Sequence, residues 1–530
     1  MTVLENIAFL EGSILKFDRE TISPAANSTA PHIHAQSEKD DADSYSDAEA
    51  GVGGIISEIL EEMGQQQCVP PTSATKFSTG SLVEKATDET EPDKETLPTS
   101  SDAPTDCLHN PTWRFQKKHI FILSEAGKPV FSLHGNEENL ASIFGVIQAL
   151  VSFVQDGQDE IKSIRAKDVQ IVFLLKPSLI LVAVSRTGFS AAQLEMQLSD
   201  VYHQIISTLT FRHLKNVFSK HKGFDLRRLL AGSERLIRHL VLSDSSTGQT
   251  NKNVFTFLTN SIRVLPMQAA ARLSIVNAIK ENCHNHKNLV FAVLIINNQL
   301  ITMVRMKKYS INPADLRLVF NLVESSESFK NYDENWTPLC LPRFDENGFL
   351  HAHVSYLTES CQACLLLFSV DKDDFFDLSE VKKRITEKLE RTQCFSIINE
   401  AAMKTKKVKL PTFGSDIPEL KHFLYKPNAI AQLLCSDFPR PYNTIEGFRH
   451  LEATYCNLIE CVHSVHRPLK LIYKTKSNEI LLAWVTSAYE LYAVFEPFAE
   501  KSTIIKHVDK LIKGIDKEFD TFFINSHPTF

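Results

Sequence analysis

The sequence predicts an α/β protein in which three units of antiparallel strands flanked by helices follow a disordered acidic arm. Short apolar runs lie next to an amphipathic stretch in three regions after residue 110. Residues 1–110, in contrast, are dominated by polar and acidic residues. Neither part carries a recognisable catalytic or nucleotide-binding motif. These observations indicate a protein that works by presenting surfaces to other macromolecules.

The arm, residues 1–110, holds 21 Asp and Glu against 6 Lys and Arg, a net charge of −15, while the remaining chain carries +8. Such a composition cannot bury enough apolar area to offset chain entropy, which predicts disorder. Ser44 and Ser46 lie among acidic residues, a context that acidophilic kinases favour. One stretch has the spacing of a short one-sided helix, through Ile55, Ile56, Ile59, Leu60 and Met63. A free helix of this length is marginal in water, so the stretch is either a docking segment or a transient helix without a role.

The first unit is expected over residues 111–245. Two strands, residues 118–124 and 129–133, flank a turn at Gly127, and an amphipathic helix follows over residues 140–154. Strands at 169–175 and 179–184 and a helix at 194–209 complete it, and a further strand near 161–166 is left open. Ser233 lacks the second glycine of a nucleophile elbow, so residues 227–240 are expected as an amphipathic helix with Ser233 near a cap.

The second unit, residues 246–400, opens with a hairpin around Asn297 and Asn298. We expect its helices at 316–323 and 378–389 and its later strands at 348–356 and 363–370. The third unit, residues 401–530, is predicted to be rearranged, because a helix at 445–463 precedes strands at 469–473, 480–485 and 489–495. A closing helix at 504–515 completes it.

The cysteine and histidine motifs predict neither a metal site nor a cofactor site. Cys361 and Cys364 form a C-x-x-C pair with no matching second pair, so packing within a strand is the expected role. His351 and His353 lie on one face of a predicted strand, where a third ligand is not identifiable. We expect both to be structural histidines and the protein to perform no chemical catalysis.

Membrane contact is expected to be peripheral. The longest uninterrupted apolar run, residues 289–296, is too short to span a bilayer. Scattered cysteines without a signal peptide indicate the cytoplasm. Basic side chains cluster at Lys404, Lys406, Lys407 and Lys409. Either this cluster contacts an anionic lipid surface or it is simply solvated. Too few aromatic residues accompany such clusters for nucleic-acid binding.

Seven separated blocks from about residue 113 to the C-terminus resemble the SAND or Mon family of vacuolar fusion proteins. They are KHIF and SEAGKP at 118–121 and 124–129, ALVSF at 149–153, DLRRLLAGSER at 225–235, WTPLCLP at 336–342, GFLHAHVSY at 348–356, HFLYK at 422–426 and LLAWVT at 481–486. The resemblance implies three longin domains. It also implies a heterodimer with a second three-longin protein, acting as guanine-nucleotide exchange factor for the late-endosomal and vacuolar Rab GTPase on endosomes and on the lysosome or vacuole.

In the family, the first longin domains of the two partners pair, and the GTPase contacts their shared sheet and helix edge. Mapped by resemblance, residues 129–140 form the active surface here. Polar contacts are then expected from Lys128, His134, Asn136 and Asn139. Val130, Phe131 and Leu133 either share this surface or only fill the core. The alternative function is a longin adaptor or tether without exchange activity, because fold alone does not give function.

The acidic arm matches no pattern of the family. We expect it to be autoinhibitory by lying on the basic body, with residues 55–63 docked in a groove, and to be released by phosphorylation or by an upstream early-endosomal GTPase. The remaining expected partner is an anionic phosphoinositide membrane.

Overall fold

The structure, a computed structural model, describes residue 113 and residues 116–530 apart from 168, 244–251, 327–333, 408–416 and 526–527. Residues 115–530 form one compact unit. Ser44, Ser46 and the apolar stretch of the arm lie outside the described residues, and so does Lys409.

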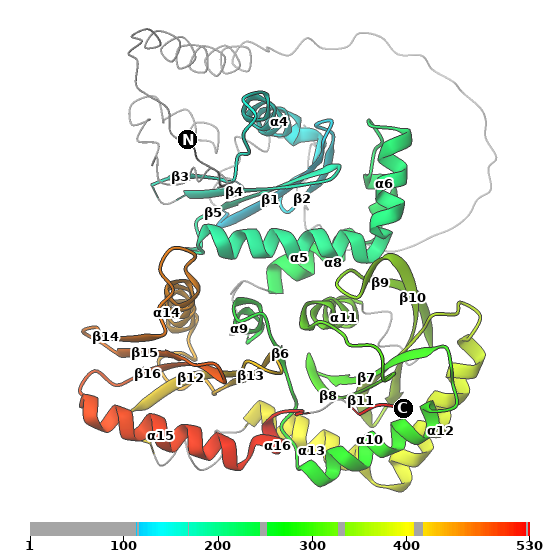
Figure 1. The fold of residues 1–530 in the computed structure, drawn as a ribbon, viewed down its shortest axis with the longest axis vertical. Coiled ribbons are helices and arrows are strands. Elements are labelled where there is room, and N and C mark those ends of the chain that lie inside the picture. The colour runs from blue at the N-terminus through cyan, green and yellow to red at the C-terminus, as the bar shows by residue number, and fades with distance from the viewer. Residues whose placement is uncertain are drawn as a thin grey trace, which may run out of the picture. The chain divides into compact units, whose positions relative to one another are not determined.

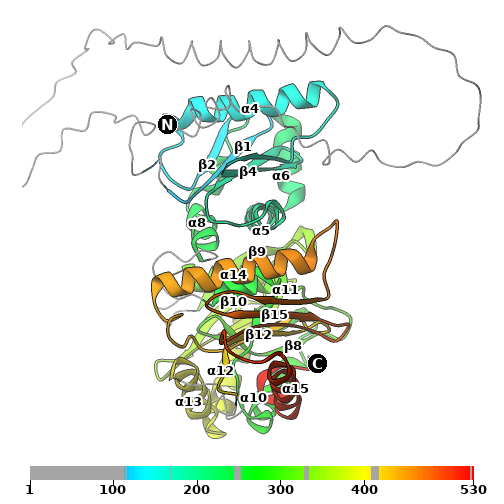
Figure 2. The same ribbon diagram turned by 90° about the vertical axis from the view of Figure 1, so that its left-hand side faces the viewer.

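The first domain is a five-stranded antiparallel sheet with a helix on each face (Figure 1). The sheet order is β2-β1-β5-β4-β3, and every neighbouring pair is antiparallel. α4 covers one face and α5 the other, so the central strands are buried on both sides (Figure 2). The elements are β1 (Lys118–Ser124), β2 (Pro129–Ser132), η4 (Glu138–Leu140), α4 (Ala141–Asp156), β3 (Ser163–Ala166), β4 (Val169–Lys176), β5 (Leu179–Ser185) and α5 (Ala191–Leu209).

Local sequence explains where α5 begins. The Ser190 hydroxyl accepts a hydrogen bond from the Gln193 amide, and the Gln193 side chain accepts one from the Ser190 amide. This capping box satisfies amide groups that the first helical turn leaves open. The strand left open near residues 161–166 is present as β3.

Four shorter helices follow α5: α6 (Phe211–Lys220), α7 (Arg227–Leu230), α8 (Glu234–Ser243) and α9 (Asn253–Leu258). The single helix expected over residues 227–240 is therefore wrong. Gly232 has φ +84°, a left-handed conformation that interrupts the helical path, and Ser233 lies immediately before α8.

The second domain repeats the topology of the first, with sheet order β8-β7-β11-β10-β9. Asn297 and Asn298 both have positive φ, as the tight turn between β7 and β8 requires. α11 covers one face, while α10, α12 and α13 cover the other. The elements are α10 (Ala269–Cys283), β7 (Leu289–Ile296), β8 (Gln299–Arg305), α11 (Pro313–Ser325), β9 (Asn335–Leu341), β10 (Asp345–Thr358), β11 (Cys361–Ser369), α12 (Phe375–Arg391) and α13 (Cys394–Lys407).

The third domain has the same strand order as the other two, so the expected rearrangement is wrong. Two strands that were not predicted, β12 and β13, precede α14 and restore the common pattern. Their sheet, β14-β15-β16-β12-β13-β6, gains a sixth strand because β6 pairs in parallel with β13. The elements are β6 (Ile262–Arg263), β12 (Leu420–Pro427), β13 (Gln432–Cys435), α14 (Ile445–His463), β14 (Leu471–Thr475), β15 (Ile480–Val485), β16 (Tyr489–Phe495), α15 (Lys501–Lys517) and α16 (Phe519–Phe522).

The first and third domains share one hydrophobic core. Buried side chains of α5, such as Leu198, belong to the same cluster as Leu451 and Tyr455 of α14. At its margin, the Ser190 hydroxyl donates to Glu460 at 2.6 Å. Burial of shared apolar area is the main stabilising contribution at such a junction.

Candidate functional site

The edge strand β2 and the segment that follows it, residues 128–140, form the candidate site, here called the β2 edge site. Among the strands that the structure describes, β2 pairs only with β1, and the register shifts between Ile122 and Leu123. An edge strand of this kind carries backbone groups that another chain is able to pair with.

The three apolar residues predicted for this site are buried within the chain. Val130 is 2% exposed, Phe131 1% and Leu133 1%, and all three belong to the core cluster that α5 covers. In this chain they therefore fix the position of β2. They present almost no surface of their own.

Side chains close the loop after β2. The Ser132 amide donates to Glu137 Oε1 at 2.8 Å, and the Ser132 hydroxyl donates to the His134 carbonyl at 2.8 Å. Asn136 Oδ1 accepts from the Glu138 amide at 3.1 Å. These bonds hold the loop in one conformation, with Asn136 and Asn139 exposed at its surface.

Residues about a hundred positions later support the same loop. Arg238 of α8 donates a hydrogen bond to the Leu133 carbonyl, and its guanidinium lies 5.7 Å from the centre of the Phe131 ring. Burial and the charge of Arg238 lower the pKa of His134 from its ordinary value. The half-buried His134 imidazole is therefore mostly neutral at pH 7.

The α6–α7 connection borders the site on another side. Arg227 pairs with Asp225 at 3.0 Å and with Glu138 of η4 at 3.6 Å. Hydrogen bonding from Arg227 lowers the pKa of the Asp225 carboxyl. A side chain at Gly223 would meet Lys128 Nζ at 3.6 Å, so the exposed Lys128 lies beside this connection.

Sequence reasoning did not assign Asp225, Arg227 or Arg238 to the site. The signal was the DLRRLLAGSER block, which contains the first two and ends three residues before Arg238. The assembled site offers exposed hydrogen-bonding and charged groups on a buried framework. Such a surface binds a folded partner through shape and charge.

A second surface lies on α4. Its buried residues, including Phe144 and Val151, face the sheet, and the Phe144 ring packs against Phe121 at 5.7 Å between centroids. Its outer side carries Val146, Ala149, Leu150 and Phe153 at helical spacing, here called the α4 outer stripe. Phe153 is 46% exposed. Asp156 is the only charged residue of the helix, which makes this an apolar surface.

Length and composition alone would let the helix from Glu138 to Asp156 cross a membrane. Ser, Gln and Gly interrupt its apolar residues, so its sequence contains no long uninterrupted apolar run. α4 packs on its own sheet through Phe144, and 28% of the apolar window of this helix is buried within the described part of the chain.

The candidate metal residues have structural surroundings. Cys361 and Cys364 are buried in β11, where burial raises the pKa of both thiols. His351 stacks on Trp336, and His353 Nε2 lies 3.3 Å from Glu334 Oε2. Within the described part of the chain, no cluster of three metal-binding side chains occurs.

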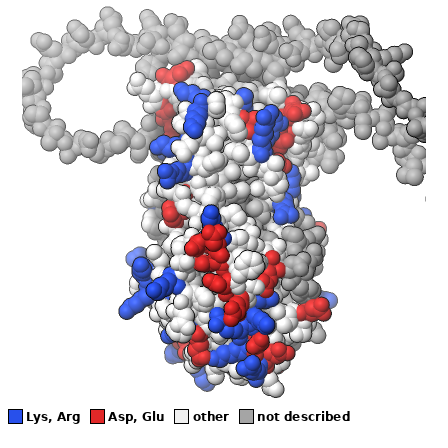
Figure 3. Space-filling view, turned by 90° about the vertical axis from the view of Figure 1, so that its right-hand side faces the viewer, with Lys and Arg blue, Asp and Glu red and all other residues white. Residues whose placement is uncertain are grey.

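The predicted lipid-contact residues Lys404, Lys406 and Lys407 lie in the last turns of α13. Figure 3 shows one face of the molecule, on which Lys and Arg side chains stand in separate groups with acidic residues between them. On that face no continuous basic patch appears among the coloured residues.

Comparison with known proteins assigns each domain. Residues 118–240, 287–387 and 419–519 match the first, second and third longin domains of FUZ, MON1 and HPS1. The chain is 41% identical to vacuolar fusion protein MON1 homolog A of Gallus gallus over 422 residues, covering 79% of this chain and 74% of the relative. It is 37% identical to protein SAND of Takifugu rubripes over 480 residues, or 90% and 89% of the two chains. It is 36% identical to vacuolar fusion protein MON1 homolog B of Homo sapiens over 434 residues, or 79% and 77%. The chain therefore belongs to the MON1 and SAND family of longin-domain proteins.

Proposed function

We propose that this chain is one subunit of a heterodimeric guanine-nucleotide exchange factor for the late-endosomal and vacuolar Rab GTPase. It would promote conversion of early to late endosomes and their fusion with the lysosome or vacuole. The names of its relatives, vacuolar fusion proteins, support a role in fusion at these membranes.

The observation that carries the proposal is the pair of surfaces on the first domain. The β2 edge site presents Lys128 just before β2, and His134, Asn136 and Asn139 on the loop after it, which Arg238 holds. The α4 outer stripe presents an apolar helix face, and such faces on soluble domains mark protein interfaces. We assign the β2 edge site to the GTPase and the α4 outer stripe to the second longin subunit.

Exchange by this arrangement needs no covalent step. A surface that binds the nucleotide-free GTPase more tightly than the loaded form shifts the GTPase toward nucleotide release. The polar groups of the β2 edge site would supply that differential affinity. The absence of catalytic motifs from the sequence is consistent with such a mechanism.

The assay is release of a fluorescent guanine nucleotide from the Rab in the presence of this chain and its partner subunit. Accelerated release by the pair supports the proposal. Release that stays at the spontaneous rate at every concentration overturns it and leaves the longin adaptor or tether.

We also propose that the protein acts in the cytoplasm, bound peripherally to endosomal and lysosomal or vacuolar membranes. Lys404, Lys406 and Lys407 at the end of α13 and the following Lys409 are the proposed contacts with anionic phosphoinositides. Charge reversal of this cluster should release the protein from vesicles that contain such lipids. Unchanged co-sedimentation would assign the cluster to solvated surface.

A further inference from the structure

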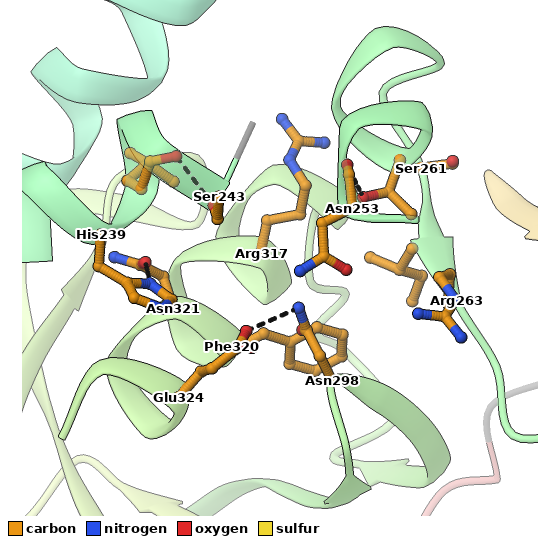
Figure 4. A pocket seen from close by; sticks show the side chains of 13 residues that line it. His239, Ser243, Asn253, Ser261, Arg263, Asn298, Arg317, Phe320, Asn321 and Glu324 are labelled. Carbon is orange, nitrogen blue, oxygen red and sulfur yellow. Dashed lines mark hydrogen bonds between the residues drawn. The ribbon is translucent and has the colours of Figure 1, made fainter. Parts of the chain in front are cut away.

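Polar side chains of the pocket beside β6 bond one another (Figure 4). The Asn298 amide donates to Glu324 at 2.9 Å, and His239 Nδ1 lies 2.7 Å from Asn321 Oδ1. These contacts join the β7–β8 turn and α8 to α11. The pocket therefore belongs to the packed junction of these elements.

The edge of the third sheet at β14 is different, because it is exposed. β14 ends the strand order of its sheet and, among the described strands, pairs only with β15 (Figure 1). Leu471 at its start is 61% exposed, and Leu469 just before it is 38% exposed. The opposite end of the same sheet is extended by β6. Residues 469–476, here called the β14 edge, therefore form the exposed edge of this sheet.

The pairing with β15 determines which main-chain groups of β14 point away from the sheet. The Lys470 carbonyl accepts from the Val485 amide at 2.7 Å, and the Lys476 amide donates to the Glu479 carbonyl at 2.9 Å. Bonded and non-bonded residues alternate along an antiparallel pair, so the even-numbered residues of this stretch bond β15. The amide and carbonyl groups that point outward are those of the odd-numbered residues Leu471, Tyr473 and Thr475.

Positive charge lies along the same edge. Residues 464–478 contain four Lys and Arg and no Asp or Glu. Lys476 pairs with Glu479 at 3.0 Å. Arg467, Lys470 and Lys474 are exposed, and none of them forms an ion pair with a residue that the structure describes. The β14 edge therefore carries charge of one sign that the chain itself leaves uncompensated.

Each face of β14 combines an apolar side chain with a lysine. Ile472 packs against the core that contains α14, and by alternation Lys470 and Lys474 flank it on that face. Tyr473 packs on the opposite face against the core that contains α15. Lys501 of α15 lies 5.5 Å from the centre of the Tyr473 ring. A strand added beside β14 would therefore meet apolar surface and positive charge on both of its faces.

We propose that the β14 edge docks an extended acidic segment of a partner protein, which adds to the third sheet as a further strand. Outward main-chain groups supply hydrogen bonds to the segment, and alternate side chains of the segment meet the two faces. Acidic side chains on the segment complement the lysines. A second copy of this chain would place lysines opposite lysines, which disfavours self-pairing. A lipid surface would use the charge but not the main-chain groups.

The β14 edge belongs to the third domain, whereas the β2 edge site and the α4 outer stripe belong to the first. The proposal therefore does not depend on exchange activity, and its test needs no GTPase.

The test measures binding of the full chain to short fluorescein-labelled peptides in which Glu alternates with Val, by fluorescence anisotropy. We expect saturable binding of these peptides and no binding of peptides with Lys in place of Glu. Peptides that are N-methylated at alternate residues keep their side chains but lose main-chain donors, and they should not bind. Hydrogen exchange of residues 469–476, followed by mass spectrometry, should slow when the unmodified Glu peptide is bound.

Two variants locate the binding. Leu471→Pro removes an outward amide without removing a bond to β15, as proline on an edge strand allows. Lys470→Glu combined with Lys474→Glu reverses the charge on exposed side chains and keeps the main chain intact. Each should weaken peptide affinity about tenfold or more, the effect of losing one or two hydrogen bonds or ion pairs. Lys215→Glu, at an exposed lysine of α6, should bind the peptide as the natural chain does.

Three results would overturn the proposal: no binding of any Glu peptide, equal binding of the N-methylated peptides, or equal binding by the charge-reversed variant and the natural chain. Co-sedimentation with phosphatidylserine vesicles is measured beside them. Vesicle binding that Lys470→Glu with Lys474→Glu abolishes, without binding of the Glu peptides, also overturns the proposal and assigns the β14 edge to a membrane.

Discussion

Arg238 donates a hydrogen bond to the main-chain carbonyl of Leu133, which joins α8 to the end of the edge strand β2 across 105 residues of sequence. The same guanidinium lies over the Phe131 ring. The loop that carries His134, Asn136 and Asn139 begins at this carbonyl. The conformation of the β2 edge site therefore depends on a helix from a later part of the chain.

Replacing Arg238 tests this dependence. Arg238→Met keeps much of the apolar stem but removes the donor, which should lower the free energy of unfolding by about 1–3 kcal/mol. Nucleotide exchange should fall as well, because the loop loses its support. Unfolding in denaturant and the nucleotide-release assay measure the two effects. Arg212→Met, at an exposed arginine of α6, is the matched control, and equal behaviour of the two variants would refute the supporting role.

The α4 outer stripe should be needed for heterodimer formation. Phe153→Asp places a charge on a surface that the partner is expected to bury, where a fully buried Phe contributes about 1.5–3 kcal/mol. We expect co-purification with the tagged partner subunit to be lost. Gln155→Asp adds the same charge at an exposed position two residues after Phe153 and outside the stripe, and it should leave co-purification intact. Retention of the partner by Phe153→Asp would assign another surface to the heterodimer.

The buried His422 predicts a loss of stability at acidic pH. Burial, assisted by the charge of Lys252, lowers the pKa of His422 to about 3, while its ordinary value is 6.5. Below pH 6.5 the unfolded chain takes up a proton that the folded chain does not, so stability falls as the pH falls from 6.5 toward 3. Between pH 7 and pH 5 the loss from this residue is about 2 kcal/mol.

Thermal unfolding at pH 7 and pH 5 measures this effect. His422→Gln removes the hydrogen bond between the imidazole Nδ1 and the Tyr455 hydroxyl, 2.8 Å long, so the variant should be less stable at pH 7. Its further loss at pH 5 should nevertheless be smaller than that of the natural protein. His466→Gln, at an exposed histidine, should keep the full pH dependence. An identical pH dependence in all three proteins would contradict the assignment.

The acidic arm should restrain exchange on membranes. Removing residues 1–110 takes away a net charge of −15, which we propose lies on the basic body and reduces access of the GTPase. The truncated protein, assembled with its partner, should release nucleotide faster than the full chain on vesicles. Replacing Ser44 and Ser46 with Glu should produce a smaller change in the same direction. Equal rates for truncated and full proteins would remove the autoinhibitory proposal.

Strands whose own residues form a clear apolar pattern could be predicted from the sequence. β7 is an unbroken apolar run that is buried along its length, and Asn297 and Asn298 end it at a turn whose positive φ values suit asparagine. The helix α5 was predictable for the same reason, because its apolar residues recur at helical spacing. Both signals lie within short windows of sequence.

The missed strands depend on distant partners. β13 has only four residues, and Gln432 within it is buried because its side chain bonds both the amide and the carbonyl of Ile524. β12 carries Lys421, His422 and Lys426 toward its two ends, although its centre is buried between β13 and β16. Without these two strands the third domain seemed rearranged. The composition of β12 and β13 does not by itself specify a strand. Their pairing with strands distant in sequence determines that they form strands.

The resemblance placed the candidate site, whereas the residues that support it could not be predicted from the sequence. Resemblance pointed to residues 128–140, and the structure finds there an edge strand followed by a loop. The supporting residues Asp225, Arg227 and Arg238 lie about a hundred positions later, beyond the reach of any periodic pattern.

The most direct measurement is Rab nucleotide release by the heterodimer carrying Lys128→Glu, beside the natural pair and a pair carrying Lys215→Glu. Both lysines are exposed, but Lys128 belongs to the β2 edge site and Lys215 to α6. The natural pair should accelerate release, Lys215→Glu should match it, and Lys128→Glu should fall about tenfold or more while remaining assembled. If the natural pair does not accelerate release, or if Lys128→Glu equals the natural pair, the β2 edge site is not an exchange surface.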